Sequence, residues 1–348
     1  MKTRKKLLIG IAIILSITVC YGQGKSQGGD PSGYHLLTKI QIGGEGGWDY
    51  LIADPDASRL YVSHATHVVV IDTKADKVIG DIPNTNGVHG IAFDHKTGRG
   101  FISDGRDNQV TIFDLKTLAN LGTAKTGQNP DAILFDPATS RVFAFNGRSN
   151  DTTVIEAADG KVVGTIALGG KPEFATSDEK GTVYVNIEDK SEVVAIDAKN
   201  LTVKAHWSLA PGEEPSGMAI DRKNNRLFSV CSNKKMTVVD PATGKVVADI
   251  ATGQGTDAAG FDPDEKLAFA SNGEGTLTVI RQDSKDKYSV IGNVKTERGA
   301  RTMALDTKTH KVYLASAQYG ETPAPTAAQP RPRPQMIPNS FTILVYGK

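Results

Sequence analysis

The stretch RLYVSHATHVVVIDTKADKVIGDI, residues Arg59–Ile82, contains short apolar runs that are separated by polar segments. Runs of four to six such residues, bounded by Gly, Asp and Lys, are typical of β-strands. The first two runs are joined by a loop that contains His64 and His67. Two histidines this close together can reach one metal ion, so the stretch raises a question about chemistry as well as about architecture.

The outline of this stretch recurs along the whole chain. Seven segments of similar sequence end in aspartate: DYLIAD (Asp49–Asp54), HGIAFD (His89–Asp94), DAILFD (Asp131–Asp136), EFATSD (Glu173–Asp178), SGMAID (Ser216–Asp221), DAAGFD (Asp257–Asp262) and RTMALD (Arg301–Asp306). Successive closing aspartates are 40 to 44 residues apart. A period in this range, with several short strands in each unit, predicts the blades of a β-propeller.

Each unit divides into four predicted strands. In the second unit these strands are GIAFD, RGFISD, VTIFDL and NLGTAKTG, and turns or loops separate them. No window of the sequence carries a convincing helical period. We interpret the seven closing aspartates as turn formers, because an aspartate side chain can accept hydrogen bonds from backbone amides two residues further on.

The two ends of the chain indicate how the ring closes. The last unit supplies three strands and no fourth, whereas the segment Tyr34–Gly43 resembles the fourth strands of other units. We expect this N-terminal strand to complete the seventh blade, which would remove an exposed sheet edge. The predicted fold is therefore all-β. It is a single seven-bladed β-propeller of four-stranded antiparallel blades, residues 34–348, closed by the N-terminal strand.

The first residues predict the compartment. Basic residues precede the apolar run Leu7–Val19, which is too short for a membrane span and suits a signal peptide. We expect a signal peptide over residues 1–22, a flexible leader over residues 23–33, and a periplasmic or secreted mature chain. A lipoprotein anchored through Cys20 is the less favoured alternative. A lipobox has a small residue before the cysteine, whereas this chain has Val19 there. No later apolar run is long enough to span a bilayer.

Charge and cysteine content exclude some classes of function. Removal of residues 1–22 leaves 36 Lys and Arg against 39 Asp and Glu, a net charge of about −3. Nucleic acid is therefore not an expected partner, because its binding proteins usually carry a basic stripe. Cys231 is then the only cysteine, so no intramolecular disulfide can form, and we interpret it as a buried strand residue. We expect a monomer.

The repeat resembles that of a known family. Tyr61-Val62-Ser63 and Tyr184-Val185-Asn186 are similar to the Tyr-Val-Thr-Asn stretch of the YVTN-family β-propellers, the YncE-like secreted proteins of bacteria. Val70–Thr73 is similar to the Val-Ile-Asp-Thr strand that follows in that repeat. The resemblance covers essentially the whole mature chain. It implies a propeller, a compartment outside the cytoplasm and a binding role, more than any particular reaction.

The best functional signal is a predicted ring of polar side chains. In a propeller the first strand of each blade lines the central channel, so the start of each repeated segment should lie near one mouth. We predict that these residues bind a ligand there: Asp49, His89, Asp131, Glu173, Ser216, Asp257 and Arg301. Clustered carboxylates raise one another's pKa values unless a cation neutralises them. The alternative is a solvated mouth with salt-bridged rims.

The histidines of the opening stretch should lie on the same face as this ring. One hypothesis joins His64 and His67 to His89 and Asp49 in a site for a divalent metal such as zinc, copper or iron. The other leaves His64 and His67 as polar residues of a surface loop. A divalent metal is the only cofactor that the sequence suggests.

Other loops of this face should surround the mouth. Arg106 and Arg148 occupy loops equivalent to that of His64, and we expect both arginines around the ligand site. The last such loop, Tyr319–Asn339, contains six prolines, which makes it extended and stiff. Its Arg331 and Arg333 could lean over the acidic mouth, so the loop is interpreted as a lid or docking segment or, alternatively, as a disordered insertion.

Two functions follow from these features. The first is a binding module that presents the channel mouth to a small molecule or a protein partner. The second is a metal-dependent hydrolase or lyase at the same mouth, with His89, Asp131 or Glu173 as general base. The sequence contains no nucleophile elbow and no phosphate-binding glycine loop, so the binding module is the favoured interpretation.

Overall fold

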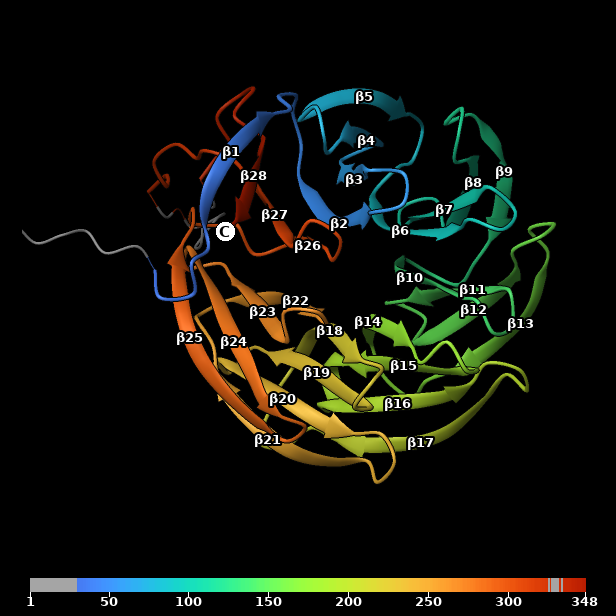
Figure 1. The fold of residues 1–348 in the computed structure, drawn as a ribbon. Helices are drawn as coiled ribbons and strands as arrows, with labels where there is room; N and C mark the ends of the chain where they lie inside the picture. Colours follow the sequence, from blue (N-terminus) through green and yellow to red (C-terminus); the bar gives the residue numbers. More distant parts are fainter. Residues whose placement is uncertain (1–29, 325, 327–331, 333) are drawn as a thin grey trace, which may run out of the picture.

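The structure is a computed structural model that describes residues 30–324, 326, 332 and 334–348. The described residues form 28 strands and one 3₁₀ turn, Glu188–Lys190, and contain no α-helix. The strands make seven four-stranded sheets that surround a central axis (Figure 1). All pairings within the sheets are antiparallel, as in β3 with β4 and β27 with β28. The predicted seven-bladed propeller is therefore confirmed.

The first three blades contain four consecutive strands each. Blade one comprises β2 (Trp48–Asp54), β3 (Arg59–His64), β4 (His67–Asp72) and β5 (Lys77–Ile82). Blade two comprises β6 (Val88–Asp94), β7 (Arg99–Asp104), β8 (Gln109–Asp114) and β9 (Asn120–Lys125). Blade three comprises β10 (Pro130–Asp136), β11 (Arg141–Asn146), β12 (Asp151–Glu156) and β13 (Val162–Ala167).

Blades four to six follow the same order. Blade four comprises β14 (Pro172–Ser177), β15 (Thr182–Ile187), β16 (Glu192–Asp197) and β17 (Thr202–Ser208). Blade five comprises β18 (Pro215–Asp221), β19 (Arg226–Cys231), β20 (Lys235–Asp240) and β21 (Lys245–Ala251). Blade six comprises β22 (Thr256–Asp262), β23 (Leu267–Asn272), β24 (Thr276–Ser284) and β25 (Lys287–Lys295).

Blade seven joins the two ends of the chain. It comprises β26 (Met303–Asp306), β27 (Lys311–Ser316), β28 (Thr342–Gly347) and the N-terminal strand β1 (His35–Gln41). The pairing of β1 with β28 runs from His35 opposite Gly347 to Gln41 opposite Thr342. This confirms the predicted closure, in which β1 covers the edge that β28 would otherwise expose.

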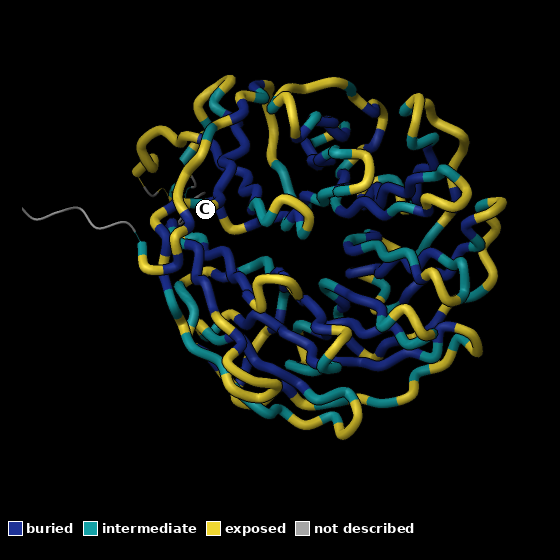
Figure 2. The backbone as a smooth tube through the Cα atoms, in the orientation of Figure 1, coloured by how far each residue is buried: buried dark blue, intermediate teal, exposed yellow. Residues whose placement is uncertain are grey.

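The core lies between neighbouring blades. In each blade the second and third strands are buried along almost their whole length, whereas the fourth forms the exposed outer rim (Figure 2). Tyr61 of blade one, for example, contacts Phe93 and Phe113 of blade two, with ring centroids 4.8 and 5.9 Å apart. Full burial of one such side chain stabilises the fold by about 1.5–3 kcal/mol. The blades therefore hold one another in a rigid ring around the channel.

The closing aspartates are structural, as predicted. Asp221 is 2% exposed and its Oδ1 accepts hydrogen bonds from the amides of Lys223 and Asn224, both at 3.1 Å. The other six make equivalent bonds to the turn that follows: Asp54, Asp94, Asp136, Asp178, Asp262 and Asp306. Each carboxylate thus satisfies backbone donors that the tight turn leaves without a strand partner.

The N-terminal predictions fall mostly outside the described residues. The signal peptide (1–22), Cys20 and residues 23–29 of the leader are not among them. Residues 30–33, the end of the predicted leader, form a turn in which Ser32 is buried and donates to Asp30. The described part of the chain has no helix long and apolar enough to cross a membrane. Cys231 is buried, as expected.

Candidate functional site

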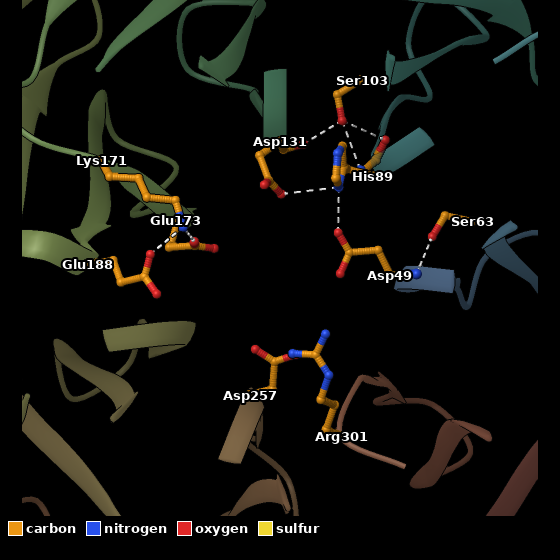
Figure 3. A network of polar contacts seen from close by, with 11 residues as sticks. Asp49, Ser63, His89, Ser103, Asp131, Lys171, Glu173, Glu188, Asp257 and Arg301 are labelled. Carbon is orange, nitrogen blue, oxygen red and sulfur yellow. Dashed lines mark hydrogen bonds and ion pairs between the residues drawn. The ribbon is translucent and has the colours of Figure 1, made fainter. Parts of the chain in front are cut away.

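The predicted ring converges on one mouth of the channel. Six of its seven side chains come from the second residue of an inner strand, and the seventh, Arg301, lies just before β26. They surround a cavity of about 300 Å³, and all of them except His89 line it directly (Figure 3). The structure therefore places these side chains at one mouth of the channel, as the repeat predicted.

A break in strand register accounts for the way these side chains point. In β2 the pairing with β3 shifts between Trp48 and Leu51, and Asp49 lies inside this irregularity. The inner strands of blades two to six shift at the same place, around His89, Asp131, Glu173, Ser216 and Asp257. Irregularities of this kind turn a side chain away from the regular alternation of a strand, here toward the channel.

Polar residues of the second strands satisfy the backbone at these irregularities. Ser63 Oγ accepts a hydrogen bond from the Asp49 amide at 2.9 Å, and Ser103 Oγ accepts one from the Gly90 amide at 2.8 Å. Asn186 donates to the Ser216 carbonyl of the next blade at 2.7 Å. These residues were not predicted to take part in the site. They could have been recognised as polar residues at an apolar position of the second strand.

His89 lies between two carboxylates. Its Nδ1 is 2.6 Å from Asp49 Oδ2 and 3.7 Å from Asp131 Oδ1. Burial lowers the pKa of His89, but the bond to Asp49 and the charges of both carboxylates outweigh it, so that the pKa is raised overall. The imidazole of His89 is also packed tightly on the side opposite the carboxylates, because a Cβ at Gly105 would lie 2.7 Å from His89 Nε2.

The carboxylates on the opposite side of the mouth are only partly neutralised. Burial, followed by the charge of Asp131, raises the pKa of Glu173 to about 8. Lys171, which was not predicted to belong to the site, donates to Glu173 Oε1 at 2.6 Å and also to Glu188. Burial likewise raises the pKa of Asp131, and the charge of Asp49 adds to the shift while His89 opposes it.

Asp257 and Arg301 form the third polar cluster. Arg301 donates to Asp257 Oδ2 at 2.7 Å, yet burial outweighs the guanidinium and raises the pKa of Asp257 to about 6. Tyr50 and Phe174, from blades one and four, meet with ring centroids 5.4 Å apart, and both line the cavity. The cavity is therefore a polar chamber with an aromatic wall, and neither aromatic residue was predicted to belong to it.

One part of the mouth has the donors for a metal ion. One ligand atom each from Asp49, His89 and Asp131 lies within 4.8 Å of the others, and the described residues contain no other group of three such side chains. Two carboxylates and an imidazole suit zinc, manganese or iron. An imidazolium that bridges two carboxylates is the arrangement without a metal.

The predicted four-residue metal site does not form. His64 and His67 face each other across a two-residue hairpin turn, and their side chains contact Phe341 and Asp81 rather than the mouth. Asp49 and His89 join Asp131 instead. His64 is also not a surface residue, because it is 1% exposed. Burial and the neighbouring His67 together lower its pKa to about 4, although a hydrogen bond with the Gly46 backbone acts in the opposite sense.

The predicted arginines of the surrounding loops take no part in the cavity. Arg106 and Arg148 are exposed, do not line it, and form no ion pair with any residue that the structure describes. The proline-rich loop is anchored at its base, where Gly320 and Ile337 donate to the carbonyls of Gln335 and Gln318 at 2.9 and 2.8 Å. Arg331 and Arg333 lie outside the described residues.

Comparisons with known proteins support the fold of the chain and assign it to no family. No family model matches the chain, and no curated protein matches it significantly. A chain of Kuenenia stuttgartiensis hydrazine synthase is 16% identical with a TM-score of 0.67, and the match covers 78% of this chain and 94% of that one. U3-55K and the WD40 repeats of RRP9 are each 10% identical, with TM-scores of 0.75 and 0.74; the matches cover 91% and 92% of this chain and 99% of each of those chains. The chain is thus a seven-bladed β-propeller, and its likeness to these structures concerns the fold alone.

Proposed function

We propose that the chain is a periplasmic or secreted binding module that holds a small cationic ligand in the mouth of its channel. The observation that carries this proposal is the composition of the cavity wall. Five carboxylates and only two permanently cationic side chains line about 300 Å³: Asp49, Asp131, Glu173, Glu188 and Asp257, with Lys171 and Arg301. This volume is at the lower end of the range for small-molecule sites.

The raised pKa values support a cation rather than an anion as ligand. Burial and mutual repulsion make Asp131, Glu173 and Asp257 reluctant to ionise. A cation among them favours their ionised forms, so its binding releases protons. Affinity should therefore rise with pH through the range from about 6 to about 8, where Asp257 and Glu173 titrate.

A panel of cations tests the proposal. We would measure thermal stabilisation of the mature protein by Ca²⁺, Mn²⁺, Zn²⁺ and small organic amines such as putrescine, at pH 6 and pH 8. Stabilisation by at least one of them that disappears in Asp131→Asn supports the proposal. Glu214→Gln is the matched control, because this exposed acid precedes the same kind of inner strand and does not line the cavity. No stabilisation by any cation, or equal stabilisation of Asp131→Asn, would refute it.

A metal-dependent hydrolase or lyase is the second candidate. It is favoured by one observation, the grouping of Asp49, His89 and Asp131 within 4.8 Å. A metal there could activate water, and Glu173, across the cavity, could serve as general base. Elemental analysis of untagged protein, followed by assay of the loaded protein on ester, phosphoester and uronate substrates, separates a metal enzyme from a binding module.

The compartment and the family are part of this proposal. The location rests on the basic and apolar residues of 1–22, and fractionation of cells that produce the full chain would test it. The relation to YVTN-family propellers rests on the stretches at Tyr61–Ser63 and Tyr184–Asn186. A small-ligand role agrees with what that resemblance implies.

A further inference from the structure

His64 and His67 lie away from the channel mouth and form a polar cluster of their own with Asp81. His64 is 1% exposed, and apart from a weak contact with the Gly46 backbone its ring nitrogens have no hydrogen-bond partner among the described residues. A buried polar group without a partner costs about 1–3 kcal/mol. The imidazole of His64 packs against Phe341, with ring centroids 4.5 Å apart. A phenylalanine at position 64 would pack there equally well. The imidazole nitrogens therefore need another explanation.

A small cavity adjoins this imidazole. It measures about 150 Å³, and its wall includes His64, His67 and Asp81 together with Gly43 and Gly44. The glycines keep the space open, since a Cβ at Gly44 would lie 2.8 Å from His64 Cε1. The volume exceeds that of a single water, for which about 30 Å³ is enough. An ion with one or two waters fits.

Two polar groups of this wall, on His67 and Asp81, have a spacing that suits metal coordination. His64 and these two residues need a side-chain rotation before all three offer ligand atoms within 4.8 Å of one another. His67 Nε2 lies 3.6 Å from Asp81 Oδ1, which is longer than a hydrogen bond. Two ligand atoms of one tetrahedral zinc ion, each about 2.1 Å from it, are about 3.4 Å apart. The rings of His64 and His67 are neighbours, with centroids 4.9 Å apart and planes at 61°.

We propose that His64 and His67 bind a transition-metal ion in this cavity, with Asp81 as a third ligand. Two imidazoles and a carboxylate select zinc, copper or nickel over calcium and magnesium. The Asp81 side chain is 53% exposed, so it is free to turn from its present position toward the ion. The site lies between blades one and seven, because His64 belongs to β3 and Phe341 directly precedes β28. All three proposed ligands belong to blade one, in β3, β4 and β5, so a bound ion would cross-link these strands beside their contact with blade seven.

The test is metal retention in variants that separate this site from the mouth. Untagged protein carrying His89→Gln and Asp131→Asn, which removes two mouth donors, is incubated with ZnSO₄ or CuSO₄, desalted and analysed by elemental mass spectrometry. We expect one equivalent to remain. A further His64→Phe substitution, which keeps the ring packing, should abolish retention, and His67→Gln should do the same. Asp81→Asn should weaken the affinity about 10- to 100-fold.

A spectroscopic measurement identifies the ligands. Copper-loaded protein with the mouth substitutions should show nitrogen hyperfine coupling in its paramagnetic resonance spectrum, and this coupling should vanish with His64→Phe. Absence of any retained metal in the protein with the mouth substitutions would overturn the proposal and leave a water-filled cavity. Retention that His64→Phe and His67→Gln do not change would overturn it as well. Both outcomes are independent of whether the mouth binds a cation.

Discussion

The two ends of each inner strand carry polar residues that behave in opposite ways. At the end of the strand, or directly after it in blade four, all seven blades have aspartate, and each carboxylate accepts bonds from the amides of the turn that follows. At the start the residue varies, and Asp131 and Glu173 face other carboxylates inside a cavity. Uniform residues with backbone partners build the ring, whereas varied residues without them are available to a ligand.

The largest effect should come from a strand end. Asp262 is fully buried, accepts bonds from the amides of Asp264 and Glu265, and contacts His310 Nδ1 at 2.7 Å. Asp262→Ala removes this buried carboxylate together with its bonds to two amides and to His310, so the free energy of unfolding should fall by about 3 kcal/mol. Urea denaturation measures this. A loss below about 1 kcal/mol would show that the closing aspartate does not stabilise the fold.

The matching change at a strand start should leave the fold intact. Asp131→Asn replaces a buried carboxylate of raised pKa by a neutral group of the same size, so the free energy of unfolding at pH 7 should change by less than about 1 kcal/mol. Cation affinity, measured by calorimetry, should fall about 10- to 100-fold. A loss of stability as large as that of Asp262→Ala would show that both ends are structural.

The pH dependence of stability sharpens the contrast. Because the pKa of Glu173 is raised from 4.5 to about 8, the folded protein binds a proton that the unfolded chain has lost between these values. Stability should therefore decrease as the pH rises from about 5 to about 8. Urea denaturation across this range compares the wild type with Glu173→Gln, which should show a shallower decrease. Identical slopes would mean that Glu173 ionises normally.

The smallest effect should come from the rim. The Arg301 side chain is 54% exposed and pairs with Asp257, so it should compete with the proposed cationic ligand for this carboxylate. Exposed pairs contribute about 0.2–1 kcal/mol, so Arg301→Gln should change stability little and raise cation affinity a few-fold. Calorimetry at pH 8 measures the affinity. A decrease would indicate that Arg301 itself contacts the ligand, which would then carry an anionic group.

The sequence predicted those parts of the molecule that depend on repetition. The seven closing aspartates, which recur every 40 to 44 residues, indicate the number of blades. The unpaired strand Tyr34–Gly43 indicates how the ring of blades closes. The ring of side chains at the mouth followed from the same alignment, because equivalent positions in a closed ring occupy equivalent places. These predictions required no knowledge of side-chain contacts.

Features that depend on neighbouring blades could not be read from the repeat. Tyr50 and Phe174 meet from opposite blades, and Lys171 joins two carboxylates whose separation depends on the 3₁₀ turn at Glu188–Lys190. His64 and His67 were expected beside the mouth. The two-residue turn that joins them instead sets His64 against Phe341, a contact that exists only because the last blade closes on the first.

Proton release on cation binding tests the role of the mouth most directly. Calorimetric titration of the mature protein at pH 7, with whichever cation stabilises it most, is repeated in buffers of different ionisation enthalpy. Binding among carboxylates of raised pKa should release protons, and both the release and the affinity should fall in Asp131→Asn while Glu214→Gln behaves as wild type. Binding without proton release, unaffected by Asp131→Asn, would place the ligand elsewhere and contradict a cation site at the channel mouth.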